Sequence, residues 1–198
     1  MVRIALTGGI ASGKSHVLAA FAARDIPTID ADLLAHAVVA GGTAAARAIE
    51  RRFGRDVVGA DGEINRRKLG EVVFSDVSAR RDLEAIIHPA VYSAIRRWFE
   101  ALPANTPLAV ADIPLLYETG HERDFDVVVV AACEPDEQIR RVMRRDGLTE
   151  AEARSRVAAQ LPIDEKISRA DYVVWTTGTQ AETSERVEDV IRRMKNEE

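Results

Sequence analysis

Apolar and polar positions along the chain follow two alternating patterns. Short runs of apolar, often β-branched residues predict buried strands, and longer segments with apolar residues at helical spacing predict helices. The expected strands are residues 2–7, 26–30, 107–112, 126–131 and 170–175. The continuous apolar run within 126–131 is typical of a parallel strand covered on both faces. We therefore expect an α/β fold with a five-stranded parallel sheet flanked by helices.

The segment from residue 33 to residue 101 interrupts this alternation, because it carries much helical and little strand signal. The expected helices are residues 43–53, 67–74, 77–87 and 90–101, with a turn-rich break at 54–62. Pro89 is expected to open the last helix, since proline is favoured at the first helical position. We interpret the segment as a helical insertion at the carboxyl edge of the sheet, where it would determine specificity for an acceptor substrate.

A helical hairpin is expected after the fourth strand. Its first helix is Pro135–Arg145, and its second helix begins at Thr149, with Glu152 at the capping-box position. Arg141 and Arg145 lie one turn apart, roughly 6 Å along the axis, and share a face. They form either a solvated basic face balanced by neighbouring acids or part of a lid that brings guanidinium groups to a transferring phosphate.

The most informative motif is the segment Gly8–Ser15, which has two glycines bracketing four free positions, followed by lysine and serine. This is the phosphate-cradling loop pattern, and it has the strand before it and the helix after it that the motif requires. The glycines allow close approach to phosphate, and the helix N-terminus offers unpaired N–H groups. Lys14 is expected to reach the β- and γ-phosphates of a nucleoside triphosphate, and the Ser15 hydroxyl to hold Mg²⁺. The expected nucleotide-binding residues are Gly8, Gly9, Ile10, Ala11, Ser12, Gly13, Lys14, Ser15 and His16.

Acidic residues end two of the expected strands. Asp112 closes an apolar strand in the manner of a Walker B acid, which predicts that it holds Mg²⁺ through water. Asp30 and Asp32 follow the second strand, at the edge where open parallel sheets bind ligands. Asp32 either orients or deprotonates an attacking hydroxyl or caps the following helix. For Asp30 we expect a structural role or a role on the Mg²⁺ side.

Three further residues are candidates for contact with the acceptor substrate. His88 is a cap, a core residue or a substrate contact, and Arg66 is either a solvated cation or an anion contact. Leu115 belongs to the apolar segment 113–118, which either packs on a substrate or is part of the core.

Composition narrows the class of protein. The chain has 198 residues, of which 46% are hydrophobic and 30% charged, as in ordinary globular proteins. A net charge of −5 argues against a general nucleic-acid-binding surface. The single cysteine, Cys133, excludes an internal disulfide and fits a reducing cytosol. No apolar run reaches membrane-spanning length, so we expect a cytoplasmic protein without membrane partners.

Taken together, these motifs resemble the bacterial dephospho-coenzyme A kinases, nearly from end to end. The phosphate loop alone is shared by many nucleotide-binding proteins, but its combination with the other stretches is far more specific. The matching stretches are Leu6–Ile10, Ser12–Ser15, Asp30–Asp32, Ile87–Pro89 with Val91, Asp112–Leu116 with Glu118, Gln138, Arg141, Arg145–Asp146, Gln160, Lys166 and Ala170–Asp171.

The resemblance implies a P-loop kinase that transfers the γ-phosphate of ATP to the ribose 3′-hydroxyl of dephospho-coenzyme A. It implies that Asp32 is the base or hydroxyl-orienting group, and that Arg141 and Arg145 clamp the phosphates. ATP and Mg²⁺ are the expected cofactors, and a monomer or weak homo-oligomer is the expected state. The implied parts are a nucleotide-binding core (1–32, 105–134 and 168–198), a helical domain for the coenzyme A acceptor (33–104) and a lid (135–167).

The sequence departs from the family pattern at three places. Position 11 is Ala where Gly is more frequent, and position 16 is His where Thr is usual. Trp175 and Thr176 stand where the family tends to carry Asp-Asn, so a contact of that asparagine with adenine is not carried over. Two alternatives remain: a kinase for another small acceptor, and a non-catalytic nucleotide-binding or switch protein. The chain has no Asn-Lys-x-Asp element that reads guanine.

Overall fold

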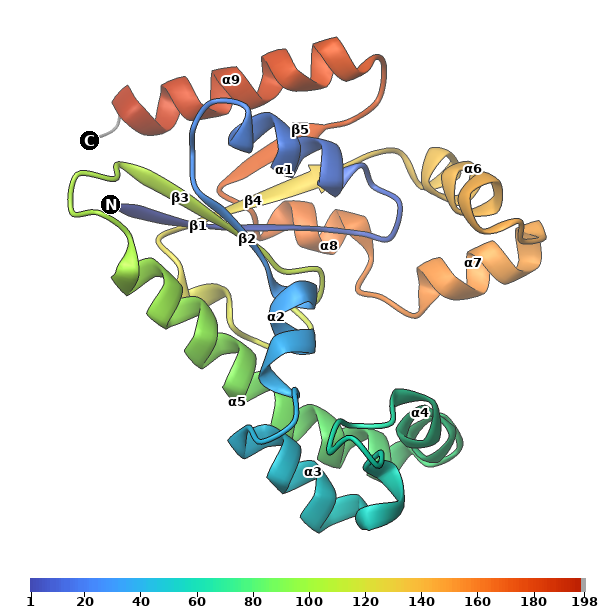
Figure 1. Ribbon diagram of the computed structural model, residues 1–198. Helices are drawn as coiled ribbons and strands as arrows, with labels where there is room; N and C mark the ends of the chain where they lie inside the picture. Colours follow the sequence, from blue (N-terminus) through green and yellow to red (C-terminus); the bar gives the residue numbers. More distant parts are fainter. Residues whose placement is uncertain (197–198) are drawn as a thin grey trace. The chain divides into compact units, whose positions relative to one another are not determined.

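The computed structural model describes residues 1–196, which form two compact units. Unit 1 comprises residues 1–29 and the chain from Pro103 onward, and unit 2 comprises Asp30–Leu102. Unit 1 contains the sheet and its covering helices, and unit 2 is helical (Figure 1).

The sheet has the strand order β2-β3-β1-β4-β5. Its strands are β1 (Val2–Gly8), β2 (Thr28–Asp30), β3 (Leu108–Asp112), β4 (Val127–Ala132) and β5 (Tyr172–Trp175). Strand β1 pairs in parallel with β3 and β4, and β4 pairs in parallel with β5. The predicted five-stranded parallel sheet is therefore confirmed for residues 1–196. Strand β2 is shorter than expected, although the Pro27 carbonyl still accepts the Val110 N–H (2.9 Å).

Helices α1 (Lys14–Ala22) and α9 (Gln180–Asn196) cover one face of the sheet, and α8 (Ile163–Ser168) lies on the other (Figure 1). Helix α8 was not expected from the sequence. The core of unit 1 lies between the sheet and the pair α1 and α9. It consists of apolar strand residues and the inward faces of both helices, among them Ile4, Leu6, Val17, Phe21, Val110, Val129, Val187 and Met194. These buried apolar faces fix α1, and with it the loop that precedes it, against β1.

Helices α6 (Pro135–Asp146) and α7 (Glu150–Ala158) form the expected hairpin (Figure 1). Helix α6 ends at Gly147, whose φ of 67° is the left-handed conformation that glycine adopts without strain. Helix α7 begins with the capping box between Thr149 and Glu152 that the sequence predicted. The hairpin is closed by a small apolar cluster around Val142 and Ala153.

Unit 2 contains α2 (Ala31–Val38), α3 (Ala44–Phe53), the short 3-10 helix η1 (Arg55–Val57), α4 (Arg66–Ser75) and α5 (Val77–Ala101). Each α-helix begins at a residue whose side-chain oxygen accepts a backbone N–H of the first turn: Asp30, Thr43, Asn65 and Asp76. Such caps satisfy donors that the helix itself leaves unpaired. The helices enclose their own apolar cluster, in which Ile49 is fully buried.

The expected break at Pro89 is wrong, because α5 is one continuous helix of 25 residues with Pro89 inside it. Proline removes the N–H that would bond to the carbonyl of Ala85. Both Pro89 and Ala85 are exposed, so water can take the place of the lost hydrogen bond. Ile86, Ile87 and Ala90 pack on the cluster of unit 2 from both sides of the proline, which holds the helix together.

Candidate active site

The phosphate loop connects β1 to α1. Gly13 precedes α1 with φ 85°, and Ala11 also has a positive φ of 55°. A Cβ atom on Gly9 would lie 2.4 Å from Gln138 Nε2, and one on Gly13 would lie 2.9 Å from the Thr176 side chain. Glycine is therefore favoured at position 13 by conformation, and a side chain at position 9 would displace the Gln138 amide. No side chain of the described residues caps α1, and the N–H groups of Lys14 and Ser15 in its first turn can face an anion, whereas the His16 N–H donates to the Gly13 carbonyl (3.0 Å).

Lys14 and Asp112 form an ion pair beside this loop. Strand β3 lies alongside β1 with Asp112 opposite Leu6, and the Ile113 N–H donates to the Leu6 carbonyl (2.8 Å). This register brings the Walker B acid to the start of the loop, as the sequence predicted. Both side chains are largely buried, so each charge is balanced by the other before a nucleotide binds.

The arrangement fits a magnesium nucleotide. Ser15 is exposed at the start of α1, and Asp112 ends the strand next to β1. Mg²⁺ is commonly held by one or two protein oxygens together with phosphates and water, so a dense cluster of acids is not required. In residues 1–196 no group of three or more His, Cys, Asp or Glu side chains forms such a cluster.

Thr176 joins the phosphate loop to α6. Its hydroxyl donates to the Ser12 carbonyl (2.6 Å) and accepts from Arg141 Nη1 (2.9 Å), while its carbonyl accepts from Arg141 Nη2 (2.8 Å). Arg141 Nε also donates to Glu137 Oε1 (2.9 Å), and this bond lowers the pKa of the Glu137 carboxyl. Arg141 is thus held at the loop through Thr176.

Arg145 has different partners from Arg141. It donates two hydrogen bonds to Asp146 (2.8 and 3.0 Å), and Arg156 donates to the same carboxylate (2.8 Å). The Arg145 bonds lower the pKa of Asp146. More than half of the Arg145 side chain is exposed, so only Arg141 of the two predicted phosphate ligands contacts the loop region in this structure.

Two glutamines of the hairpin bind the peptide groups of Ile10. The Ile10 N–H donates to Gln160 Oε1 (2.6 Å), and Gln138 Nε2 donates to the Ile10 carbonyl (2.8 Å). The backbone donor of Ile10 is therefore occupied by protein. Of the predicted loop residues, Ile10 does not offer its amide to a phosphate in this structure.

A buried cation lies beneath the loop. Lys166 is completely buried and pairs with Glu118 (2.8 Å). Its Nζ also donates to the carbonyls of Pro114 (3.2 Å) and Gly8 (3.4 Å), and the Thr7 hydroxyl donates to the same Pro114 carbonyl (3.1 Å). These contacts fix the segment after β3 against the first residue of the phosphate loop.

The remaining unit 1 candidates lie on either side of the loop. The His16 ring faces α9, where its Nε2 contacts the Gln180 carbonyl (2.9 Å) and the Ser184 hydroxyl (3.2 Å). Leu115 is 43% exposed, whereas the next residue, Leu116, is fully buried. The segment 113–118 is therefore partly core, and Leu115 is the side chain it leaves open to a ligand.

The acceptor-side candidates belong to unit 2. The Asp30 carboxylate accepts from the N–H groups of Asp32 (2.7 Å) and Leu33 (3.3 Å), which confirms a structural role for Asp30. Asp32 lies exposed in the first turn of α2. Arg66 contacts the ring of His36, and His88 is half-buried within α5.

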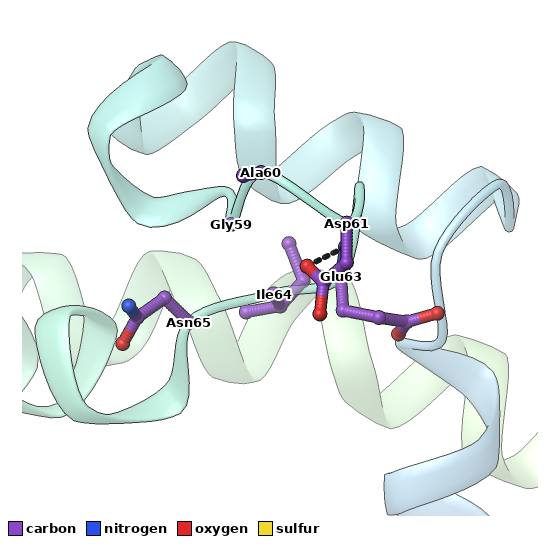
Figure 2. A pocket seen from close by; sticks show the side chains of 6 residues that line it. All are labelled: Gly59, Ala60, Asp61, Glu63, Ile64 and Asn65. Atoms are coloured by element: carbon purple, nitrogen blue, oxygen red, sulfur yellow. Dashed lines mark hydrogen bonds between the residues drawn. The ribbon is translucent and has the colours of Figure 1, made fainter.

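Unit 2 also has a shallow pocket of about 320 Å³ at the turn of residues 59–65 (Figure 2). The Glu63 N–H donates to Asp61 Oδ1 (3.1 Å), and the Glu63 carboxylate accepts the Gly41 N–H (2.8 Å). Both carboxylates thus serve the fold of the turn. None of the predicted site residues lines this pocket.

The structure assigns contacts to residues that sequence reasoning left without a role. Gln138, Gln160, Lys166 and Glu118 were noted only as matching positions, and Thr176 only as a departure. Their signal in the sequence is weak, because a polar residue that is buried in the fold cannot be told from a surface one by its type.

In residues 1–196 no helix is long and apolar enough to cross a membrane.

Comparison with known proteins places these features in one family. The family model described as dephospho-CoA kinase matches residues 2–182. A dephospho-CoA kinase from Anaeromyxobacter dehalogenans is 53% identical over 176 residues, covering 88% of this chain and 83% of the relative. One from Geobacillus kaustophilus is 45% identical and covers 96% of this chain and 95% of the relative.

Solved structures agree with the sequence relatives. A crystal structure of a protein from Thermus thermophilus superposes with a TM-score of 0.77 at 35% identity, covering 97% of this chain and 96% of that chain. A dephospho-CoA kinase from Campylobacter jejuni has a TM-score of 0.64 at 26% identity, with coverage of 97% and 96%. A shikimate kinase from Bacteroides thetaiotaomicron, at 17% identity with a TM-score of 0.57 and coverage of 98% of each chain, shares the fold alone. The phosphate loop, the Lys14–Asp112 pair and these matches together show that the chain belongs to the dephospho-CoA kinase family.

Proposed function

We propose that the chain transfers the γ-phosphate of ATP to the ribose 3′-hydroxyl of dephospho-coenzyme A, which gives coenzyme A and ADP. The observation that carries this proposal is a phosphate loop with its Lys14–Asp112 pair, in a chain whose family match extends over residues 2–182. Kinases of this class act by positioning the phosphates and neutralising their charge.

On the nucleotide side, the N–H groups at the start of α1 cradle the phosphates, and Lys14 exchanges its bond to Asp112 for a bond to the β- and γ-phosphates. Ser15 and Asp112 hold Mg²⁺, which, when bound, neutralises charge that develops on the phosphates. His16 lies on the next position of α1, at the side of α9.

On the acceptor side, Asp32 orients or deprotonates the attacking hydroxyl. Its exposure in the first turn of α2 supports this role, because a catalytic carboxylate must reach the substrate. Arg66, His88 and Leu115 are each proposed to contact the acceptor. Water exclusion by the segment 135–167 would complete the site.

Arg141 and Arg145 are proposed to stabilise the transferring phosphate. Arg141 already lies beside the loop through its contacts with Thr176. Arg145 must exchange its bonds to Asp146 for bonds to phosphate, and its exposure makes that exchange sterically open.

We also propose that the protein works in the cytoplasm, as a monomer or weak homo-oligomer, on small-molecule substrates. The single cysteine supports a reducing compartment, and the net charge of −5 supports small-molecule substrates over nucleic acid.

A coupled assay of ADP release tests the proposal. Dephospho-coenzyme A, adenosine monophosphate and shikimate are offered as acceptors with MgATP, and mass spectrometry identifies the phosphorylated product. We expect turnover with dephospho-coenzyme A and its loss in Lys14→Met. A higher kcat/KM with either other acceptor would contradict the proposed substrate, and ADP release that is independent of any acceptor would contradict acceptor phosphorylation altogether.

A further inference from the structure

Both peptide groups of Ile10 in the phosphate loop have side-chain partners. Both the N–H and the carbonyl of Ile10 are bound by side chains, at 2.6 Å by Gln160 and at 2.8 Å by Gln138. The two glutamines come from both ends of one hairpin: Gln138 lies in α6, and Gln160 follows the last residue of α7. One residue of the loop is thus held from both ends.

Each glutamine is itself fixed. Gln138 is 3% exposed, lies in the second turn of α6 and donates its own N–H to the Glu134 carbonyl (2.9 Å). The residue after Gln160 is Leu161, whose N–H donates to Glu118 Oε1 (3.1 Å), and Glu118 pairs with the buried Lys166. Gln138 is therefore held by burial, and the backbone beside Gln160 is held by the bond from Leu161 to Glu118.

Apolar contacts act at the same point. Ile10 and Ala11 pack on a cluster of Ile139, Val142 and Ala153, which is also the core of the hairpin. Gly9 lies so close to Gln138 that a Cβ atom at position 9 would be 2.4 Å from Nε2. The apex of the loop and the hairpin therefore share one set of contacts.

We propose that Gln138 and Gln160 are positioning residues that hold the Ile10 peptide in the phosphate-binding shape, so that the position of the hairpin α6–α7 sets the conformation of the loop at Ile10. Pre-shaping of the loop lowers the ordering cost of nucleotide binding. A movement of the hairpin would then change the loop directly, without passing through the sheet. The inference rests on the proposed ATP binding by this loop.

Gln160 accepts a hydrogen bond from Ile10 and Gln138 donates one to it, so the isosteric change from glutamine to glutamate should have opposite effects at the two positions. In Gln160→Glu the acceptor of the Ile10 N–H is retained. In Gln138→Glu the donor is lost, and a buried carboxylate oxygen faces the Ile10 carbonyl. Gln160→Met and Gln138→Met remove each bond without adding charge. Arg154→Ala is the matched control, because Arg154 lies on the exposed face of α7 and pairs only with Glu150 among the interactions described.

The first measurement is hydrogen exchange of the Ile10 amide in the nucleotide-free protein, by NMR. We expect Gln160→Met to accelerate this exchange about fivefold or more, since a hydrogen bond between half-buried groups contributes about 1 kcal/mol and 1.4 kcal/mol is a factor of ten. Gln160→Glu and Arg154→Ala should leave it within about twofold of the original chain. Because no ATP is present, failure here is distinguishable from failure of the proposed function.

The second measurement is the ATP dependence of turnover. We expect Gln138→Glu to raise the KM for ATP about tenfold or more, with Gln138→Met and Gln160→Met raising it by about fivefold, while Arg154→Ala leaves it unchanged. A purely structural role would lower the melting temperature but leave KM unchanged where the protein is folded. If Gln138→Glu does not fold, Gln138→Met carries the test. Unchanged Ile10 exchange in Gln160→Met, or unchanged KM in both methionine variants, would overturn the proposal.

Discussion

Replacement of Thr176 by valine tests the connection between the phosphate loop and α6. The two side chains have nearly the same shape, so the change removes the hydroxyl and leaves the volume. The hydroxyl donates to the Ser12 carbonyl (2.6 Å) and accepts from Arg141 (2.9 Å). The Ala132 carbonyl lies near this hydroxyl, but in the variant it still accepts a hydrogen bond from the Thr176 N–H (2.8 Å). The main loss is therefore at Ser12.

The magnitude follows from these partners. A buried carbonyl without a donor costs about 1–3 kcal/mol, and the lost bond to Arg141 adds about 1 kcal/mol. The extra methyl group offsets about 0.8 kcal/mol where it is buried. A net loss of about 2 kcal/mol lowers the melting temperature of a chain this long by about 4–8 °C. Because the affected carbonyl belongs to the loop, the KM for ATP should rise as well.

Calorimetry and ATP titration measure the two effects. Thr176→Ser keeps the hydroxyl and loses one methyl group, so it should cost only about 1 kcal/mol and leave KM unchanged. Thr177→Val, at the exposed neighbouring position, controls for the added methyl group. A melting temperature for Thr176→Val equal to that of the original chain would refute the reasoning, since it would mean that the hydroxyl bonds contribute nothing to the folded loop.

Three other changes have defined outcomes. Lys166→Met leaves Glu118 without its buried partner; we expect a loss of about 3 kcal/mol in urea unfolding, because Glu118 is partly exposed, and a midpoint like that of the original chain would contradict this. Burial raises the pKa of Tyr117 to about 12, so its contribution to stability is complete below pH about 10 and is lost as the pH rises through about 12. Tyr117→Phe should remove that titration from the absorbance at 295 nm without loss of stability, since the hydroxyl has no hydrogen-bond partner in residues 1–196; destabilisation would count against this. Asp32→Asn should lower turnover about 10²- to 10⁴-fold with ATP binding retained, and unchanged turnover would exclude Asp32 as the base.

Much of unit 1 could be predicted from local pattern. The β-branched runs placed the strands, and the glycine and lysine spacing placed the loop, because both features depend on residues adjacent in sequence. The place of Asp112 beside the loop was predicted from the Walker B form of its strand, whereas the register with β1 and the pair with Lys14 come from the structure.

The contacts that hold the site together could not be predicted in the same way. Gln138, Gln160 and Lys166 are buried by partners far along the chain, and polar residue types favour the surface unless such partners exist. The continuity of α5 through Pro89 depended likewise on tertiary packing, which outweighed the local preference for a helix start. Sequence pattern thus predicted the strands and the phosphate loop, but not the buried polar residues that hold the loop in place.

The ion pair between Lys14 and Asp112 has a consequence for which anions the loop accepts. The Lys14 ammonium group is already paired with the Asp112 carboxylate, so an incoming anion must compete with that carboxylate for Lys14. We expect sulfate or orthophosphate, which can contact few backbone N–H groups of the loop, to compete poorly with the carboxylate. A triphosphate can contact many of these N–H groups at once. We therefore expect the Asp112 carboxylate to weaken the binding of small anions to the empty loop more than the binding of a triphosphate.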